Sequence, residues 1–276
     1  MRANLFIALI ISAILGCSVF FWQSDDSEIS YHTENEFGPI WVYDSKGLRC
    51  MSFLEPPAAI LQSCMSLSNP KDVLFNYIQM FLSAFFVVED PRKILIIGLG
   101  GASVPKALNI LAPNAKIHIV EVNPAIPPIA EEYFDYKFNN TNRVFIEDGV
   151  EYVKNSASDR YDMVFIDAFS TNYIPDGFLT PEFMNNVKRI LTKRGVVAMN
   201  TFVSSEKEEL ESKLFKDTFG EYYNLKKATS RVMIAGSSKL PDYNQIAINS
   251  NLWLYRMVEV GVSQTILLSL YKDALR

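Results

Sequence analysis

RKILIIGLGGASVPKALNILAPNAKIHIVEVN, residues 92–123, is the stretch of sequence that decides the fold. An apolar run at 94–97 leads into a glycine turn at 98–103, and a second apolar run at 117–120 ends on Glu121. In a strand, turn, helix and strand unit of this kind, the glycines let the backbone approach a ligand closely. An acid about twenty residues later can bind ribose hydroxyls. The stretch therefore predicts a nucleoside-binding site.

The glycines of the turn are Gly98, Gly100 and Gly101, and Ser103 stands where a dinucleotide fingerprint has its third glycine. A turn of this kind also serves as a plain tight connection between a strand and a helix. Glu121 favours the binding interpretation, because it stands at the carboxyl end of a strand, where open α/β sheets bind ligands. We therefore expect these three glycines and Glu121 to bind the nucleoside.

The composition is that of a globular protein with small-molecule partners. The chain has 276 residues, of which 49% are hydrophobic and 21% are charged. This length suits one large α/β domain with a small appended module. The net charge of −5, without any run of lysines and arginines, argues against a nucleic-acid partner.

An apolar segment near the N-terminus indicates export. Residues 5–22 are uncharged and mostly apolar, and they follow Arg2. Their number is intermediate between the core of a signal peptide and a single membrane-spanning helix. Residues 14–17, Ile-Leu-Gly-Cys, also resemble a bacterial lipoprotein cleavage box ending at Cys17. We expect residues 1–24 to be a signal peptide or membrane anchor that places the body on the periplasmic side; a buried helix is the alternative.

The remaining cysteines and the histidines give no sign of a metal site. Cys50 and Cys64 match no zinc spacing, and His32 and His118 are the only histidines. The two cysteines can form a disulfide in an oxidising compartment or remain two buried thiols. We expect no metal.

The chain preceding the glycine turn predicts a small module. Two short strands, 40–43 and 48–53, are joined by a polar turn and indicate a β-hairpin. Apolar residues at helical spacing predict a buried helix at 73–88. We place the β module and this linking helix at residues 25–90, with Pro91 at the boundary.

Strands and helices then alternate along residues 91–240. Continuous apolar strands in such an alternation predict a Rossmann-like, methyltransferase-type α/β fold, with a parallel sheet covered by helices on both faces. Residues 241–276 form a C-terminal helical extension that closes the open edge of the sheet or contributes to a homodimer. The expected elements are strands at 92–97, 115–121, 143–147, 161–167, 196–202, 222–228 and 231–236, and helices at 102–112, 125–135, 149–155, 182–191 and 205–217.

Several pieces of the sequence, in their order and spacing, resemble a divergent member of the spermidine synthase family of polyamine aminopropyltransferases. The resemblance covers residues 28–236 and implies a small β module followed by a methyltransferase-like Rossmann domain. The matching pieces are Gln62-Ser63, 98–101, Val120-Glu121, Asp148-Gly149 and 161–167.

The resemblance implies a role for each of several residues. Glu121 would hold the ribose of decarboxylated S-adenosylmethionine, Asp148 and Gly149 would lie against the adenine, and Gln62 would lie over the ligand. Asp167 would accept the proton of the attacking amine, because transfer needs a nitrogen lone pair. The alternatives are a plain turn for Asp148 and Gly149, surface exposure for Gln62 and a helix-capping role for Asp167.

The sequence departs from the family pattern at four positions, one of which is His32, where the family has a glutamine in the N-terminal strand. Gly101 replaces an aspartate that the family has in the glycine turn. Ser170 replaces a second aspartate three residues after Asp167, and Ile78 replaces a histidine after Tyr77. The loss at Ser170 matters most, since the acid pair would hold the amines of a polyamine. Asp176 could restore a carboxylate, although a loop aspartate is the alternative.

We therefore expect a transferase of polyamine biosynthesis. It would bind decarboxylated S-adenosylmethionine or S-adenosylmethionine as a co-substrate, without a tightly bound cofactor, and move an aminopropyl group to an amine acceptor. Methyl transfer is the alternative within enzymes. A non-catalytic binding or scaffold protein that keeps the fold is a second class, favoured by the missing acids and the export signal. The glycine turn also fits a nicotinamide-dependent oxidoreductase, but the sequence shows no set of residues typical of hydride transfer.

Overall fold

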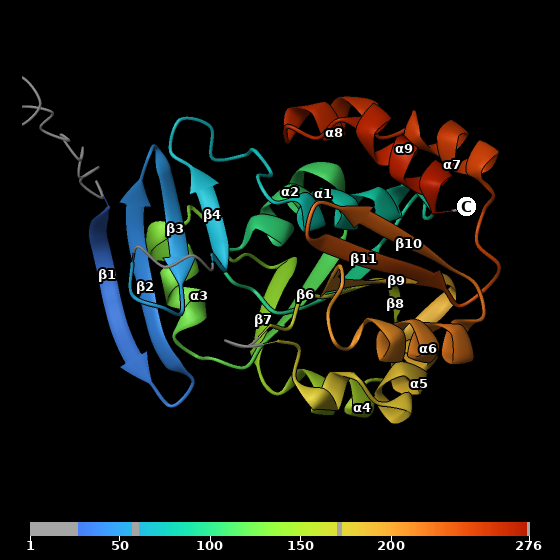
Figure 1. Cartoon of the computed structure of the whole chain (residues 1–276), viewed down its shortest axis with the longest axis horizontal. Helices are drawn as coiled ribbons and strands as arrows, with labels where there is room; N and C mark the ends of the chain where they lie inside the picture. Colours follow the sequence, from blue (N-terminus) through green and yellow to red (C-terminus); the bar gives the residue numbers. More distant parts are fainter. Residues whose placement is uncertain (1–26, 57–60, 170–172, 275–276) are drawn as a thin grey trace, which may run out of the picture.

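The N-terminal module is a four-stranded antiparallel sheet (Figure 1). The computed structural model describes residues 27–56, 61–169 and 173–274. The sequence predicts only the central hairpin of this module. The outer strands escape prediction because the first is largely exposed and the last has only four residues. In order across the sheet, the strands are β1 (Glu28–Asn35), β2 (Gly38–Ser45), β3 (Leu48–Ser52) and β4 (Ser63–Ser66).

The main domain is built on a seven-stranded sheet, which confirms the predicted fold class. Its strand order is β10-β11-β9-β8-β5-β6-β7. The five strands from β9 to β7 in this order run parallel, and β11 runs antiparallel to both β9 and β10. The strands are β5 (Lys93–Ile97), β6 (Lys116–Glu121), β7 (Asn142–Ile146), β8 (Tyr161–Ile166), β9 (Leu191–Phe202), β10 (Tyr222–Lys227) and β11 (Ser230–Gly236).

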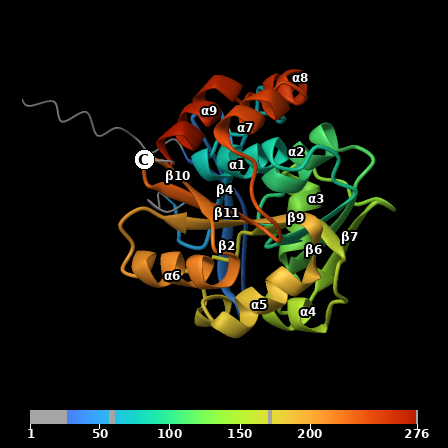
Figure 2. The same ribbon diagram turned by 90° about the vertical axis from the view of Figure 1, so that its right-hand side faces the viewer.

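Helices cover both faces of this sheet (Figure 2). Alternate residues of β5 explain why: Ile94 and Ile96 belong to the core under α1, α2 and α3, whereas Leu95 and Ile97 belong to the core under α4, α5 and α6. The helices are α1 (Asn76–Leu82), α2 (Ser103–Leu111), α3 (Ile126–Tyr133), α4 (Gly149–Asn155), α5 (Pro181–Ile190), α6 (Glu208–Phe219), α7 (Tyr243–Ser250), α8 (Leu254–Glu259) and α9 (Gln264–Asp273), with 3-10 turns η1 (Ser83–Phe86) and η2 (Asp176–Phe178).

The C-terminal extension, which the sequence predicts to be helical, holds three helices. Tyr271 of α9 contacts the ring of Tyr223 in the edge strand β10, with 4.7 Å between the centroids. Its hydroxyl also donates to the carbonyl oxygen of Ser83 at 3.0 Å. The extension thus packs on the open edge of the sheet, as expected. It leaves Ile248 and Tyr255 exposed, and the homodimer contact stays a prediction.

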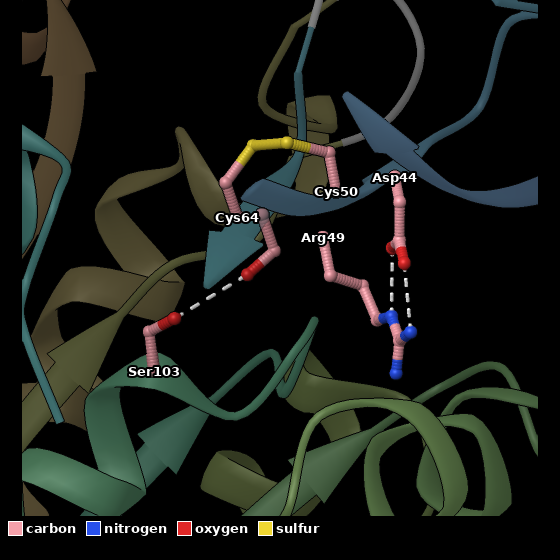
Figure 3. The surroundings of a disulfide bond; sticks show 6 residues. Asp44, Arg49, Cys50, Cys64 and Ser103 are labelled. Atoms are coloured by element: carbon pink, nitrogen blue, oxygen red, sulfur yellow. Dashed lines mark hydrogen bonds and ion pairs between the residues drawn. A yellow bond between two sulfur atoms is a disulfide. The ribbon is translucent and has the colours of Figure 1, made fainter. Parts of the chain in front are cut away.

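A disulfide joins Cys50 to Cys64, which decides between the two alternatives for these cysteines. The two residues are register partners on the neighbouring strands β3 and β4. Beside them, the guanidinium of Arg49 donates two hydrogen bonds of 2.8 Å to the carboxylate of Asp44 (Figure 3). The disulfide therefore fixes the short strand β4 to the rest of the module.

The predicted export segment, residues 5–22, and Cys17 lie outside the described residues. Within the described ranges 27–56, 61–169 and 173–274, no helix is both long and apolar enough to cross a bilayer. The signal peptide or anchor at residues 1–24 therefore stays a prediction.

We expect the double variant Cys50→Ala/Cys64→Ala to unfold more readily than the wild type. The cysteines are 14 residues apart, and closing a loop of this length in the unfolded chain stabilises a protein by about 3 kcal/mol. Urea denaturation with and without dithiothreitol measures the difference. The reductant should destabilise the wild type and leave the double variant unchanged. Titratable thiols at Cys50 and Cys64 in the unreduced wild type would contradict the disulfide.

Candidate active site

A cavity of about 840 Å³ opens where the central strands end. It lies at the carboxyl ends of β5 to β9, where ligands bind in open α/β sheets. The N-terminal module and the start of α1 contribute the opposite wall. Its volume suits a ligand of nucleoside size with room for a second molecule. Residues lining it include Phe37, Met51, Gln62, Ser63, Phe75, Tyr77, Ile78, Gly98, Gly100, Glu121, Asn123, Glu147, Asp148, Gly149, Asp167, Phe169, Asn200, Phe202, Thr229 and Ser230.

The cavity brings together seven of the eight site residues that the sequence predicts. Gly101 is the exception, because it does not line the cavity. A Cβ atom at Gly101 would lie 2.7 Å from Ser63 Oγ and 2.9 Å from Phe134 Cδ1. This glycine lets β4 pack against the turn, and the aspartate usual in the family would not fit here. The seven lining residues are Gln62, Gly98, Gly100, Glu121, Asp148, Gly149 and Asp167.

Gly98 sets the geometry of the turn. Its φ of 94° lies in the left-handed region, and a Cβ atom would lie 2.3 Å from the carbonyl oxygen of Asp167. Its own N–H donates to the carbonyl of Val120 at 2.8 Å. Only glycine therefore lets the ends of β5, β6 and β8 meet at this point.

Glu121 is a buried carboxylate at the end of β6. One oxygen accepts a hydrogen bond from the N–H of Leu99 and the other from the N–H of Asn123, both at 2.9 Å. Burial raises the pKa of Glu121, and these backbone hydrogen bonds act in the opposite direction. Each carboxylate oxygen can accept a further hydrogen bond, which suits two neighbouring sugar hydroxyls.

Asp148 and Gly149 form the cavity wall at the start of α4. Asp148 is the N-cap of this helix and accepts hydrogen bonds from the N–H groups of Val150 and Glu151, at 2.8 and 3.0 Å. A Cβ atom at Gly149 would lie 2.6 Å from Ile97 Cγ2. The pair is thus more than a plain turn, since it caps a helix and shapes the wall.

Asp167 follows β8 and lies deep in the cavity, partly accessible through it. Its carboxylate accepts a hydrogen bond of 3.0 Å from Asn200 Nδ2 and a second one from the hydroxyl of Tyr77. Burial raises its pKa to about 6, the charge of Glu121 adds to this rise, and the two hydrogen bonds oppose it. Such a group is ionised at neutral pH and holds a proton in mild acid. The next described helical turn begins only at Asp176, so Asp167 caps no described helix.

Two partners of Asp167 lie beyond what the sequence predicts. Asn200 comes from β9, and its side-chain Oδ1 is buried without a hydrogen-bond partner among the described residues. A polar residue at the end of the otherwise apolar run 196–199 is the signal that could have found it. The Tyr77 hydroxyl comes from α1, and burial beside Asp167 raises its pKa well above the usual value. Its approach to Asp167 depends on long-range packing, which leaves no local pattern.

Of the other described positions that the sequence singles out, Ile78 lies in the cavity wall, and Asp176 and His118 lie outside it. Asp176 is exposed, pairs with Lys207 and does not line the cavity, as expected for a loop aspartate. Ile78 is buried in the cavity wall, and Ser170 lies outside the described residues. His118 accepts or donates a hydrogen bond of 2.9 Å with the Tyr161 hydroxyl, and burial lowers its pKa to about 4. The described residues contain no group of side chains suited to a metal ion.

Comparisons with known proteins agree with this geometry. A family model described as the spermine/spermidine synthase domain matches residues 77–255. The chain is 34% identical over 223 residues to the polyamine aminopropyltransferase of Vibrio vulnificus, a match that covers 78% of this chain and 74% of that protein. It is 30% identical over 124 residues to the eEF1A lysine and N-terminal methyltransferase of Bos taurus, covering 41% of this chain and 18% of that protein.

Solved structures share the fold. A probable spermidine synthase from Corynebacterium glutamicum superposes with a TM-score of 0.69 over 90% of this chain and 95% of that chain. The two sequences are 15% identical, so this likeness concerns the architecture alone. The family model, in contrast, matches more than half of the chain, and the Vibrio vulnificus relative is similar over most of its length. The chain therefore belongs to the spermine/spermidine synthase family.

Proposed function

We propose that the protein transfers an aminopropyl group from decarboxylated S-adenosylmethionine to an amine. One observation carries this proposal: the same cavity holds the buried carboxylate of Glu121 and, across the glycine turn, the carboxylate of Asp167. The first suits a ribose and the second suits a reacting amine. The similarity to a polyamine aminopropyltransferase over 78% of the chain supports the same reaction.

The donor would lie over β5, β6 and β7. Gly98 and Gly100 let the backbone approach the nucleoside, and Glu121 accepts hydrogen bonds from its ribose hydroxyls. Asp148 and Gly149 would lie beside the adenine. Gln62, which leads into β4, lines the cavity from the N-terminal module, a position that suits a residue lying over the ligand.

The reaction is an in-line displacement at the carbon beside the sulfonium. The lone pair of the acceptor nitrogen forms the new N–C bond, the C–S bond breaks, and sulfur keeps the bonding electrons. Before this step, the acceptor ammonium gives one proton to the carboxylate of Asp167, which frees the lone pair. The products are 5′-methylthioadenosine and an aminopropylated ammonium. The protein mainly supplies alignment and this base.

Asn200 and Tyr77 would position the base. Both donate to the carboxylate of Asp167, so they hold it in one orientation and stabilise its ionised form. The unpartnered Oδ1 of Asn200 can accept a hydrogen bond from the same amine. The reacting nitrogen would then contact two acceptors before transfer.

Methyl transfer from S-adenosylmethionine is the second candidate. The half of the cavity over β5 to β7 would hold that nucleoside equally well, and the methyltransferase relative matches 41% of the chain. Formation of S-adenosylhomocysteine in place of methylthioadenosine would favour it. A folded protein that binds neither nucleoside would be a scaffold.

We expect methylthioadenosine to bind the full-length protein and the variant Glu121→Gln to bind it at least about tenfold more weakly. A hydrogen bond to a charged group contributes about 1.5–3 kcal/mol, and the amide removes that charge. Calorimetric titration measures both dissociation constants. Asp176→Asn is the matched control, since this acid lies outside the cavity and should leave binding unchanged. Equal affinities of Glu121→Gln and wild type would rule out the ribose assignment.

We expect kcat to fall as the pH drops below about 6, the pKa of Asp167. The carboxylate must be ionised to accept the proton, so kcat should increase as the pH rises through this value. Asp167→Asn should lower kcat by about 100-fold or more and remove this inflection. Steady-state rates between pH 5 and 8 check it, with Asp176→Asn again as control. An unchanged inflection in Asp167→Asn would assign the base elsewhere.

We also propose that the body of the protein lies outside the cytoplasm, anchored by its N-terminal segment. The apolar run at 5–22 and the cleavage-like sequence at Cys17 support export. The disulfide between Cys50 and Cys64 supports it independently, because disulfides persist mainly in oxidising compartments.

Protease accessibility tests this location. In spheroplasts of a bacterial host, added protease is expected to digest the body without lysis, because an exported domain faces the medium. A cytoplasmic marker protein should survive the same treatment. Protection of the body until the cells are lysed would contradict export.

A further inference from the structure

The strand order divides the cavity into two sides. From Asp167, which follows β8, the donor site proposed above extends over β5, β6 and β7. The other side extends over β8, β9 and the turn between β10 and β11, and we call it the acceptor side. Its lining residues are Asp167, Phe169, Asn200, Phe202, Thr229 and Ser230.

The acceptor side offers one carboxylate. Of the acids that line the cavity among the described residues, Glu121, Glu147 and Asp148 lie on the donor side, and Asp167 is the single acid on the acceptor side. The undescribed residues between Phe169 and Tyr173 are Ser170, Thr171 and Asn172, and none of them is acidic. Among the described residues, the acceptor side therefore has one anionic group for one reacting nitrogen.

Three acids in neighbouring elements are already paired with cations. The most buried is Glu211, which pairs with the fully buried Arg231 at 2.8 Å and also accepts a hydrogen bond from the Tyr173 hydroxyl. The two others are exposed or near the surface. The pairs are Glu211 with Arg231, Asp176 with Lys207, and Glu208 with Lys226. Their charges are therefore balanced by cations of the protein itself.

Two aromatic rings line the acceptor side. The rings of Phe169 and Phe202 lie 5.0 Å apart, and both line the cavity. Tyr173 packs on each of them at 5.9 Å, and its hydroxyl, which donates to Glu211, accepts a hydrogen bond from Ser205 Oγ at 2.9 Å. These contacts hold the rings in place, so they present an apolar wall next to Asp167.

We propose that the acceptor is a primary amine with a single charge and an apolar alkyl or aryl body, and not a diamine. This inference rests on the proposed function. Asp167 and the free Oδ1 of Asn200 bind the nitrogen, and Phe169 and Phe202 contact the body of the substrate. A second ammonium would lose its hydration against these rings without a carboxylate to replace it. The bonds formed and broken are those of aminopropyl transfer given above.

Rates with matched amines test the proposal. Full-length protein is supplied with decarboxylated S-adenosylmethionine and either n-hexylamine, 2-phenylethylamine or 1,4-diaminobutane, and methylthioadenosine release is measured. We expect kcat/KM for the monoamines to exceed that for the diamine by at least about tenfold. An equal or higher value for 1,4-diaminobutane would overturn the proposal, and would indicate that the rings bind the second ammonium by cation–π contacts.

A pair of nearly isosteric variants isolates the missing charge. Thr229 lines the acceptor side at an exposed position, so Thr229→Asp adds a carboxylate there and Thr229→Asn adds the same volume without charge. The first should raise kcat/KM for 1,4-diaminobutane by about tenfold relative to the second, and leave that for n-hexylamine within about twofold. An equal effect of both variants on the diamine would contradict the charge argument.

Binding distinguishes a wrong acceptor from a wrong reaction. Protein saturated with methylthioadenosine is titrated with n-hexylamine and with 1,4-diaminobutane. Tighter binding of n-hexylamine supports the proposal even without turnover. Tighter binding of the diamine, or no binding of either amine, overturns the acceptor proposal alone. If methylthioadenosine itself does not bind, the proposed function fails and the acceptor proposal fails with it.

Discussion

The contact between the backbones of Gly98 and Asp167 is the constraint on which the rest of the site depends. No side chain fits at Gly98, since a Cβ atom would lie 2.3 Å from the carbonyl oxygen of Asp167. This close approach lets β5 end beside both β6 and β8. The carboxylates of Glu121, the last residue of β6, and of Asp167, which follows β8, therefore lie in one cavity. The donor and the base of the proposed reaction owe their proximity to this one backbone contact.

The N-terminal module completes the cavity. Ser63 at the start of β4 packs against Gly101 and lies 3.5 Å from the hydroxyl of Ser103, at the start of α2. Asn35 at the end of β1 donates to the side chain of Asn123 at 2.9 Å. Because the disulfide fixes β4 to β3, the module behaves as a wall attached to the glycine turn at several points. This attachment also positions Gln62, which precedes β4, in the lining of the cavity.

The main sheet could be predicted because its strands are continuous apolar runs separated by amphipathic helices, and buried parallel strands have this pattern. The outer strands β1 and β4 could not, since exposure and shortness remove the same signal. Within the site, Glu121 and Asp167 were recognisable because each directly follows an apolar strand. Asn200 and the Tyr77 hydroxyl were not recognisable, because their part in the site depends on hydrogen bonds to Asp167 from elements far apart in the sequence. Gly101 was expected to bind ligand and instead makes room for Ser63, a packing role that spacing alone does not reveal.

The central claim is that a nucleoside occupies one side of this cavity and leaves the other side to an amine, with Asp167 between them. A crystal structure of the full-length protein with methylthioadenosine tests it most directly. The account predicts that both ribose hydroxyls donate to Glu121, that the adenine lies beside Gly149, and that the sulfur faces Asp167. A nucleoside lying between Phe169 and Phe202, or bound elsewhere on the protein, would contradict it.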